Sequence, residues 1–474
     1  MKDVRERFLQ TVLRYRLNPD APGSEEYWSP ELDTIKRDTL REIQSEKLVA
    51  AVRYVYERSL FYRAKFTAIK LTPADIKSVE DLWKIPITTK QEMAQDVAEH
   101  PPWGTYSPID GDLWSRQGWM LFTSSGTTAQ PRPFRYTLFD RDMWAWSDAR
   151  SLWAMGVRPG DKAFLAFGYG PFCAFWGFHQ GFNRIGVPVM TGGALDSKRR
   201  AYFIHTFSPT VLVATPSYCL FLGSVMQEMG YDPATSSIRM IVSGGEPGVC
   251  IPSTKRRIES LWGARLHEMY GCTEAAPSAG GCLCHAEVHN YRPSTHLLED
   301  CQIWETVDPQ TFAPLPPGGR GLTVATNLIS EGSPQLRFLV GDFATLTHEQ
   351  CSCGMTHARA IGGFQGRADD MLNIRGLTVF PSAVEEVVRQ IDELGDEFEI
   401  VVYAEQELDC LRIVAEVRPE VPVSQHTPLA EKIVTEVRTK IGLRPEVELK
   451  PFGTLPKTEL KARRLRDLRS VERH

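Results

Sequence analysis

Apolar residues change their spacing along the chain, and each change indicates a different kind of structure. Up to about residue 100 the sequence is highly charged, and apolar residues recur at helical spacing, as in segment 45–56. From Met120 to about Gly362, short apolar runs such as 162–167 and 210–214 alternate with helical stretches. That alternation predicts parallel strands joined by crossover helices.

The spacing changes again after Gly366. We expect helices over 382–391 and 427–441, paired strands over 398–405 and 411–418, and a last strand over 447–450. Glycines cluster at 362–367, where the two patterns meet, which favours a linker there. The chain is therefore predicted to be an α/β protein. Residues 1–365 would form a large N-terminal domain of mixed and parallel sheets with flanking helices, and residues 366–474 a small α+β domain.

Composition narrows the classes of function. A net charge of −5 gives no electrostatic reason to expect a nucleic-acid partner. The start, Met1–Arg7, is charged, and no apolar run is long enough to span a bilayer, so we expect no targeting segment, no membrane partner and a cytoplasmic location. The ten cysteines are then more often reduced thiols or metal ligands than disulfides.

A run of hydroxyl side chains lies between apolar flanks in segment 122–132. Consecutive hydroxyls with a glycine can wrap a polyphosphate, and this run consists of Ser124, Ser125, Gly126, Thr127 and Thr128. The alternative is an ordinary Ser/Thr-rich hairpin loop, because turns favour these residues in any case. The spacing differs from GxxxxGK[ST], which argues against a P-loop NTPase.

Further segments carry groups that a nucleotide site needs. Tyr270 could offer a flat ring to a base, and Glu274, four residues on, could hold a hard cation such as Mg²⁺. Asp342 could accept hydrogen bonds from ribose hydroxyls, while Arg367 donates to sugar or phosphate. Taken singly, these residues could equally form strand-end turns and a surface ion pair. The chain then ends in a turn that presents Lys461, a cation that such a site otherwise lacks.

Read in order, these segments resemble the adenylate-forming enzyme superfamily, and within it the phenylacetate–CoA ligase-like branch. The resemblance rests on SSGTT at 124–128, YGCTE at 270–274, GRADDMLNIRGLTVFPSAVEE at 366–386 and GTLPKTELKA at 453–462. It implies ATP, Mg²⁺ and CoA as cofactors. An acid would be activated as its acyl-adenylate, and a thiol would then displace AMP. The sequence departs from the family's usual pattern at Arg132, where many members have lysine or threonine.

The resemblance also implies a role for each matching residue. Lys461, Glu274 and Thr273 would be catalytic, with Mg²⁺ at Glu274. The ATP and AMP site would consist of Ser124, Ser125, Gly126, Thr127, Thr128, Gly245, Glu246, Pro247, Tyr270, Gly271, Asp342 and Arg367. The small C-terminal domain would be mobile, turning about Asp369 to bring Arg375 and Gly376 to the CoA channel. Members of the branch often form homodimers.

Aromatic residues in segment 167–179 bear on the identity of the acid. The family has small residues beside the acyl pocket in this segment, and the added bulk predicts a shorter pocket with Tyr136 and His179 as possible donors. The predicted pocket residues are Tyr136, Phe172, Phe175, Trp176, Phe178 and His179. They favour a short branched 2-hydroxy acid, and the match is most similar to the 2-hydroxyisobutyrate–CoA ligase type. Alternatively, the aromatics face the core or a partner subunit, and the substrate is phenylacetate or another aryl acid.

Two other classes of function stay open. The chain could adenylate an acid and load it on a carrier protein, although the lack of an attached carrier domain favours free CoA. It could also be a non-catalytic nucleotide-binding protein, but Lys461, Glu274 and Asp342 argue against that.

Two CxC segments form a separate group. Cys284, Cys351 and Cys353 could hold a structural Zn²⁺, with His289 or His296 as a further donor. Such a metal would brace the large domain and take no part in catalysis. The alternative is a set of reduced thiols in loops.

Overall fold

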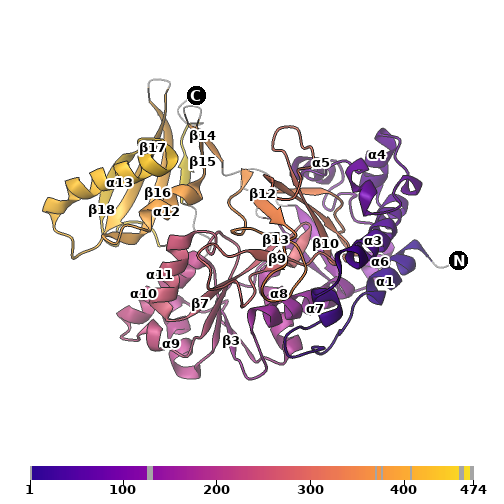
Figure 1. Ribbon diagram of the computed structural model, residues 1–474, viewed down its shortest axis with the longest axis horizontal. Coiled ribbons are helices and arrows are strands. Elements are labelled where there is room, and N and C mark those ends of the chain that lie inside the picture. Colours follow the sequence, from indigo (N-terminus) through magenta and orange to yellow (C-terminus); the bar gives the residue numbers. More distant parts are fainter. Residues whose placement is uncertain are drawn as a thin grey trace. The chain divides into compact units, whose positions relative to one another are not determined.

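The computed structural model describes residues 3–124, 132–368, 371–374, 377–405, 408–457 and 464–469 (Figure 1). Several predicted site residues lie outside these ranges: Ser125, Gly126, Thr127, Thr128, Asp369, Arg375, Gly376 and Lys461. The chain forms two compact units. The first combines Met1–Thr191 with His267–Gly363, and the second combines Gly192–Leu266 with Phe364–His474. A domain boundary after residue 365 stays a prediction.

Helices dominate the N-terminal part of the first unit. They are α1 (Val4–Arg14), α2 (Pro30–Asp33), α3 (Arg37–Arg58), α4 (Leu60–Ala68), α5 (Lys90–Glu99), α6 (Gly111–Arg116), α7 (Leu138–Met155) and α8 (Cys173–Ile185), with short 3₁₀ turns η1 (Pro73–Asp75) and η2 (Val79–Lys84). Local sequence starts several of them. In α7, Thr137 and Asp140 form a capping box that satisfies the free backbone N–H groups of the first turn.

The first unit also contains three groups of paired strands. Strands β1 (Trp119–Thr123) and β2 (Pro133–Thr137) form an antiparallel hairpin, and β3 (Ala163–Leu165) and β4 (Val189–Thr191) are parallel. The third group runs in the order β10 (Gln302–Val307), β11 (Arg320–Asn327), β12 (Phe338–Thr347), β13 (Arg359–Ala360), β9 (Thr295–Leu297), β8 (Ala276–Cys282) and β7 (Arg265–Cys272). Its neighbours pair antiparallel.

The predicted fold class is confirmed as an α/β protein with mixed and parallel sheets and flanking helices. The expectation of parallel strands holds for β3 and β4, whereas the strands from β7 to β13 are antiparallel. Only the turn 273–275 separates β7 from β8. Antiparallel neighbours can be joined by so short a connection, while parallel neighbours need a crossover of a dozen or more residues.

The second unit begins with α9 (Ser197–Phe207), β5 (Val211–Val213), α10 (Pro216–Glu228), η3 (Pro233–Thr235), β6 (Met240–Ser243) and α11 (Pro252–Trp262). Strands β5 and β6 are parallel, with α10 as their crossover. All residues of both strands are buried, which fits the continuous apolar run of a strand covered on both faces.

The C-terminal part of the second unit is built around one four-stranded sheet. Its strand order is β18 (Glu446–Pro451), β17 (Leu408–Val417), β16 (Leu394–Glu405) and β19 (Leu465–Asp467). Before the sheet come the hairpin of β14 (Leu372–Ile374) with β15 (Leu377–Val379) and helix α12 (Pro381–Val388). The short turn η5 (Val423–Gln425) and helix α13 (His426–Ile441) follow β17. The elements predicted over 382–450 are all present, with ends shifted by a few residues.

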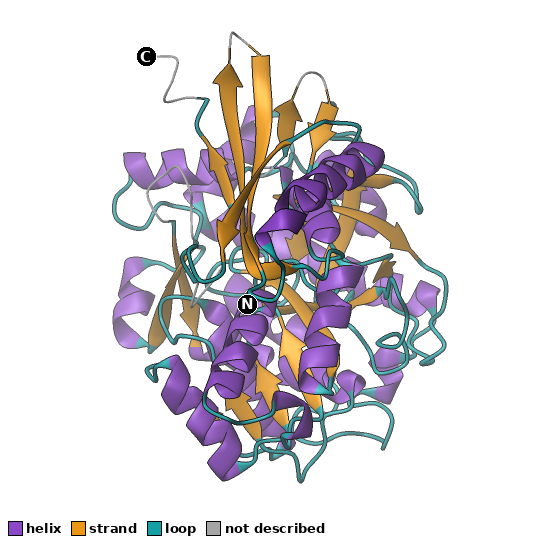
Figure 2. Ribbon diagram, turned by 90° about the vertical axis from the view of Figure 1, so that its left-hand side faces the viewer, coloured by secondary structure: helices purple, strands orange, loops and turns teal. Residues whose placement is uncertain are grey.

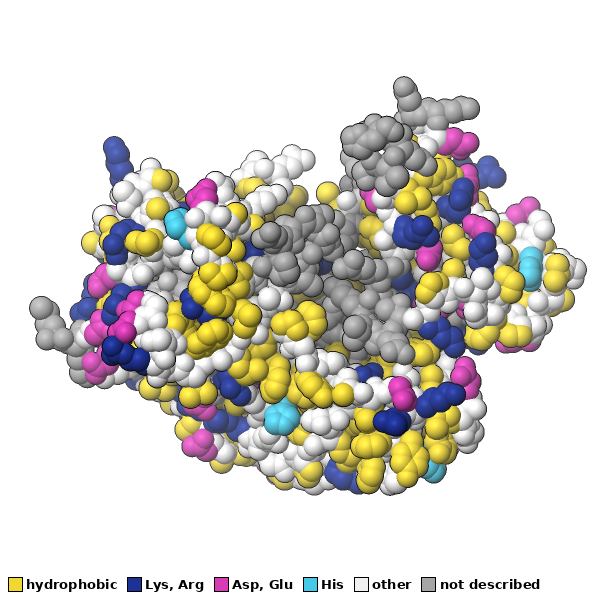
Figure 3. Space-filling view, turned by 180° about the vertical axis from the view of Figure 1, so that it is seen from behind, with side chains coloured by type: hydrophobic (Ala, Val, Ile, Leu, Met, Phe, Trp, Pro, Cys, Tyr) yellow, Lys and Arg dark blue, Asp and Glu magenta, His cyan; other side chains and the backbone are white. Residues whose placement is uncertain are grey.

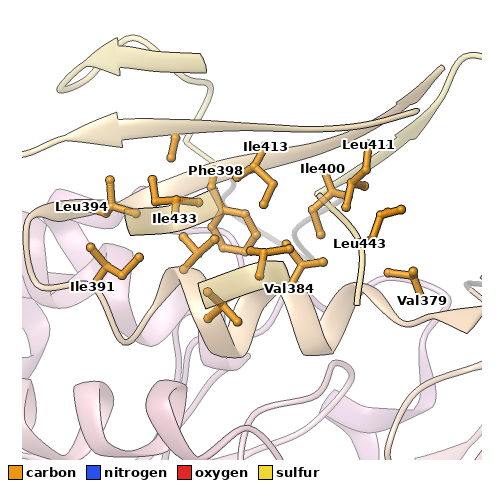
Figure 4. Close-up of a cluster of buried hydrophobic side chains, with 14 of the residues drawn as sticks. Val379, Val384, Ile391, Leu394, Phe398, Ile400, Leu411, Ile413, Ile433 and Leu443 are labelled. Carbon is orange, nitrogen blue, oxygen red and sulfur yellow. The ribbon is translucent and has the colours of Figure 1, made fainter. Parts of the chain in front are cut away.

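An apolar core joins the helices to this sheet. Val384 of α12 and Ile433 of α13 pack with Phe398, Ile400 and Ile413 of the two central strands, and all five are buried (Figure 4). Figure 2 shows α13 lying along the sheet. Side chains from α12, α13 and both strands therefore form the core of this part of the unit.

Charged side chains of both signs intermingle on the face of the molecule shown in Figure 3. Salt screens exposed charges of either sign beyond about 10 Å. Among the described helices, none combines the length and the apolar character needed to cross a membrane.

Candidate functional site

The predicted phosphate loop connects the two strands of a hairpin. Strand β1 ends at Thr123 and β2 begins at Pro133. The backbone N–H of Ser124 donates to the carbonyl of Arg132 at 3.2 Å, which closes the base of the connection. Ser124 is buried, and its Oγ has no hydrogen-bond partner among the described residues. A buried hydroxyl of this kind is available to a ligand.

Glu274, the predicted Mg²⁺ ligand, forms a buried ion pair. It lies in the turn between β7 and β8, and Arg132 Nη2 lies 2.8 Å from its Oε1. The side chains of both residues are at most 9% exposed. Burial strengthens the attraction between the two charges. Removing either partner would leave an unpaired buried charge, which is strongly destabilising. The sequence did not predict this contact, because 142 positions separate the two residues.

Tyr136 fixes the same turn from β2. Its hydroxyl donates to the carbonyl of Thr273 at 2.5 Å. Burial, the largest influence, raises the pKa of Tyr136 well above its usual value, so the hydroxyl stays protonated and keeps donating. Because this hydrogen bond already uses the hydroxyl proton, donation to an acid substrate would require the bond to break.

The start of helix α8 contacts both the hairpin and the turn. The carbonyl of Pro171 accepts from the backbone N–H of Thr123 at 3.0 Å. Cys173, the first residue of α8, places its Sγ 3.6 Å from Thr273 Oγ1. The hairpin, the start of α8 and the turn at 273–274 therefore meet in the first unit. Sequence reasoning did not single out Cys173, although it lies within the aromatic segment 167–179.

The aromatic residues predicted for the acyl pocket differ in burial. Phe175 and Phe178 are 4% and 3% exposed, whereas Phe172 is 49% exposed. The Phe175 ring packs against Trp176 at 5.3 Å and against His179 at 6.1 Å between centroids, and Trp176 and His179 are half-buried. Burial and then the charge of Arg141 lower the pKa of His179, which favours its neutral imidazole.

A second contact joins two predicted nucleotide residues. Tyr270, near the end of β7, donates its hydroxyl to Asp342 Oδ2 on β12, and its ring lies 5.8 Å from that of Trp304. Gly341 has φ 86°, a left-handed conformation that glycine adopts without strain. Tyr270 and Asp342 are therefore held together next to exposed Gly271.

The remaining predicted nucleotide residues belong to the second unit. Glu246 follows Gly245, which has φ 85°, and its Oε1 accepts from the backbone N–H of Ser217 in the first turn of α10 at 2.6 Å. Burial raises the pKa of Glu246, and the hydrogen bonds from Ser217 oppose that rise. Exposed Pro247 and half-buried Arg367 lie in the same unit.

Cys284, Cys351, Cys353 and His296 form a compact cluster in the first unit. Their Sγ and imidazole nitrogen atoms all lie within 4.8 Å of one another. Of the two histidines considered from the sequence, His296 on β9 is buried in this cluster, whereas His289 is exposed.

Comparison with known proteins identifies the family. Residues 67–329 match the model of the AMP-binding enzyme family, and residues 376–469 match that of the AMP-binding enzyme C-terminal domain. The phenylacetate-coenzyme A ligase of Thermus thermophilus is 35% identical over 458 residues, which cover 93% of this chain and 99% of that protein. The enzyme of the same name from Escherichia coli is 30% identical, with 93% and 97% covered.

Solved structures agree with this assignment. A crystal structure of 2-hydroxyisobutyryl-CoA ligase in the postadenylation state, with 2-HIB-AMP, is 28% identical with a TM-score of 0.88, covering 95% of this chain and 94% of that chain. In the thioesterification state the same ligase has a TM-score of 0.70 and 29% identity, with the same coverage. The chain therefore belongs to the AMP-binding, adenylate-forming enzymes. Among them it is an acyl-CoA ligase of the AMP-forming type, as the resemblance to the phenylacetate–CoA ligase-like branch predicted.

Proposed function

We propose that this enzyme activates a short branched 2-hydroxy acid, such as 2-hydroxyisobutyrate, and transfers it to CoA. The acid would displace pyrophosphate from ATP to form an acyl-adenylate, and the CoA thiol would then displace AMP. The observation that carries the proposal is the meeting of the hairpin, the start of α8 and the turn at 273–274. Those contacts bring predicted phosphate, acyl and Mg²⁺ residues together within the first unit.

The first step needs positive charge around the phosphates, because negative charge develops on the attacking, bridging and leaving oxygens. We assign this role to Lys461 and to the donors of the loop Ser124–Thr128. Glu274 fits Mg²⁺, since carboxylate oxygens are the preferred protein ligands of this ion and the described ion pair with Arg132 is made through Oε1. Mg²⁺ bound at Glu274 would neutralise phosphate charge. Thr273, the residue before Glu274, would take part in the same step.

The nucleoside would lie beside Tyr270 and Asp342. The Tyr270 ring and the segment Gly245–Pro247 would pack against adenine, and Asp342 would accept hydrogen bonds from the ribose hydroxyls. The bond from Tyr270 to Asp342 uses one carboxylate oxygen and fixes the orientation of both groups. Arg367 would donate to sugar or phosphate.

In the second step we propose that the C-terminal segment turns about Asp369. This motion would withdraw Lys461 and bring Arg375 and Gly376 to the CoA thiol. Support comes from the similar 2-hydroxyisobutyryl-CoA ligase, which has been solved in both a postadenylation and a thioesterification state. We further propose a cytoplasmic location and a homodimeric state. Light scattering of the purified protein would test the dimer.

Two observations bear on the identity of the acid. The buried aromatics of α8, Phe175 and Phe178, favour a small pocket and hence a small acid. The relatives called phenylacetate-coenzyme A ligases favour an aryl acid as the second candidate. Loading of a carrier protein is a third possibility, which an assay with free CoA distinguishes.

The substrate is tested by AMP release from ATP and Mg²⁺ with CoA. The acids are 2-hydroxyisobutyrate, lactate, isobutyrate, benzoate and phenylacetate. Turnover confined to the small acids is the expected result. A preference for phenylacetate would overturn the small-pocket proposal, and AMP release that does not depend on free CoA would favour a carrier-protein acceptor.

The chemistry is tested by Lys461→Ala. This variant should lose acid-dependent exchange of pyrophosphate into ATP and still bind ATP, because the lysine would act mainly on charge that develops during the reaction. Normal exchange by the variant would refute the assignment. Lys457→Ala is the matched control, since this nearby lysine is instead paired with Glu228.

A further inference from the structure

The geometry of the cysteine and histidine cluster points to a metal centre separate from the Mg²⁺ site. We propose that Cys284, His296, Cys351 and Cys353 together bind one Zn²⁺ as a closed, purely structural site. Cys284 follows β8, His296 lies on β9, and the two other cysteines lie between β12 and β13. A metal here would cross-link three stretches of chain that are well separated in sequence.

The distances fit tetrahedral zinc. Bonds of about 2.3 Å to sulfur place two thiolates of one tetrahedron about 3.8 Å apart, and a sulfur and a nitrogen slightly closer. Cys284 Sγ and Cys351 Sγ are 3.8 Å apart, and Cys353 Sγ lies 3.4 Å from His296 Nε2. The sulfur–sulfur distance is far too long for a disulfide of about 2.05 Å. The thiols are thus arranged as ligands around a common centre.

The chemistry of the ligand set selects the metal. Three soft sulfur ligands with one imidazole are typical of structural zinc, whereas Mg²⁺ and Ca²⁺ require oxygen ligands. Four protein ligands complete a tetrahedron and leave no position for a substrate or a water molecule. We therefore assign the site no part in the ligase reaction, and its occupancy does not depend on which acid the enzyme uses.

Neighbouring groups hold the ligands in place. The backbone N–H of Cys353 donates to Cys351 Sγ at 3.5 Å, and Gly354 adopts φ 86° immediately after it. The Tyr27 hydroxyl donates to the carbonyl of Cys353 at 2.6 Å. Such contacts orient metal ligands before the metal binds, which raises affinity.

A charged pair also lies beside the cluster. Glu287 Oε1 lies 3.7 Å from Cys351 Sγ and 3.1 Å from Arg359 Nη1. Three thiolates, a neutral imidazole and Zn²⁺ together carry one negative charge. The arginine therefore offsets part of the combined negative charge of Glu287 and the metal centre.

The site is tested by the metal content of the full-length protein, purified from zinc-supplemented medium. Elemental analysis should find about one zinc per chain, as expected for one closed site. Cys284→Ser and His296→Gln should lose most of that zinc. Cys410→Ser is the matched control and should keep it, because Cys410 lies on β17 outside the cluster. Zinc-free wild type, or full zinc content in Cys284→Ser, would overturn the proposal.

A second set of measurements uses the wild type alone and therefore holds even if the variants fail to fold. Cobalt added to the chelator-treated wild type should give the intense visible bands of tetrahedral coordination together with sulfur-to-metal charge-transfer bands. Removal of zinc by a chelator should lower the melting temperature, and zinc should restore it. Weak octahedral cobalt bands, or a melting temperature that does not respond to chelator, would contradict the site. Both readouts are independent of catalysis.

Discussion

Single side chains determine how the turn at 273–274 is held. Arg132 contacts Glu274, and Tyr136 contacts the carbonyl of Thr273, so two neighbouring residues of the turn are each fixed by the hairpin. Tyr136 was predicted as a donor to the acid. That role stays a prediction, and the observed contact with Thr273 adds a second role, as a support of the turn.

Replacing Tyr136 with phenylalanine separates these two roles. Tyr136→Phe removes only the hydroxyl and should lower the free energy of unfolding by about 1 kcal/mol, since one intramolecular hydrogen bond is lost. The KM for 2-hydroxyisobutyrate should change little. Urea denaturation and steady-state kinetics measure the two effects. A large rise in KM with unchanged stability would instead mean that the hydroxyl serves the substrate.

At the scale of elements, α8 brings the aromatic residues to the site. Its first residue contacts Thr273, and Phe175 lies half a turn further on. Whether the bulk of Phe175 fills the acyl pocket or only the core can be distinguished by comparing two buried phenylalanines of the same helix.

Phe175→Ala should broaden the substrate range towards phenylacetate, because it removes a large side chain from the proposed pocket. Phe182→Ala is the matched control: Phe182 is also buried on α8 and stacks on Phe178. Each variant should cost about 3–5 kcal/mol of stability through the cavity it leaves. The ratio of kcat/KM for phenylacetate and 2-hydroxyisobutyrate is the measurement. An equal shift in both variants would contradict a specific role for Phe175.

Helices α11 and α12 of the second unit share a buried polar contact. Ser253 of α11 donates to Glu386 Oε2 of α12 through its hydroxyl at 2.7 Å and through its backbone N–H at 3.0 Å. Both residues are buried. We therefore expect this contact to stabilise the second unit.

Ser253→Ala tests that expectation. The variant should lower the free energy of unfolding, which urea denaturation measures. A hydrogen bond to a charged acceptor contributes about 1.5–3 kcal/mol, which sets the upper limit of the effect. The matched control is Ser224→Ala, whose hydroxyl donates to the carbonyl of Leu220 within α10. A loss for Ser253→Ala no larger than that of the control would contradict a stabilising role for the contact.

At the scale of the whole molecule, a buried ionic network ties distant parts of the first unit together. Arg150 of α7 lies 2.8 Å from Asp33 of α2 and 2.9 Å from Asp300, which precedes β10. Burial, the largest influence, would raise the pKa of Asp300, but the charges of Arg150, Lys47 and His357 and the hydrogen bond from Arg150 together outweigh it and lower the pKa. The aspartate is therefore charged in the folded protein, and Arg150 is a counter-charge to two buried carboxylates.

Arg150→Met should destabilise the protein by about 3–5 kcal/mol at neutral pH, because both carboxylates lose their counter-charge. With a lowered folded-state pKa, Asp300 stabilises the wild type at pH values above its unfolded pKa, and this contribution disappears as the pH falls through the folded pKa. The difference in free energy of unfolding between wild type and variant should therefore shrink on acidification. The buried carboxylates of the variant, which lack the arginine, become protonated and neutral at a higher pH than those of the wild type. Urea denaturation at pH 7 and at about pH 3, below the unfolded pKa of an aspartate, measures this difference.

Arg14→Met is the control for charge removal as such. Arg14 pairs with Glu46, but their side chains are 61% and 48% exposed, so the expected loss is below about 1 kcal/mol. A loss for Arg150→Met as small as that of the control, or one that does not depend on pH, would contradict the network.

Local sequence was sufficient to predict much of the fold. The helices and strands over 382–450 and the α/β class follow from apolar spacing, which reflects burial of one face of each element. The antiparallel strands from β7 to β13 were not distinguished from parallel ones, since strand direction depends on how the chain connects rather than on spacing.

The sequence by itself determined the enzyme family, because SSGTT, YGCTE and the C-terminal motifs are contiguous and their order is visible in the chain. Only the tertiary structure decided which distant residues meet. It paired Arg132 with Glu274 and Tyr136 with Thr273, and it placed His296 rather than His289 beside the three cysteines. The physical reason is that such contacts join residues far apart in the chain. They form only when many apolar contacts elsewhere fix the arrangement of the strands.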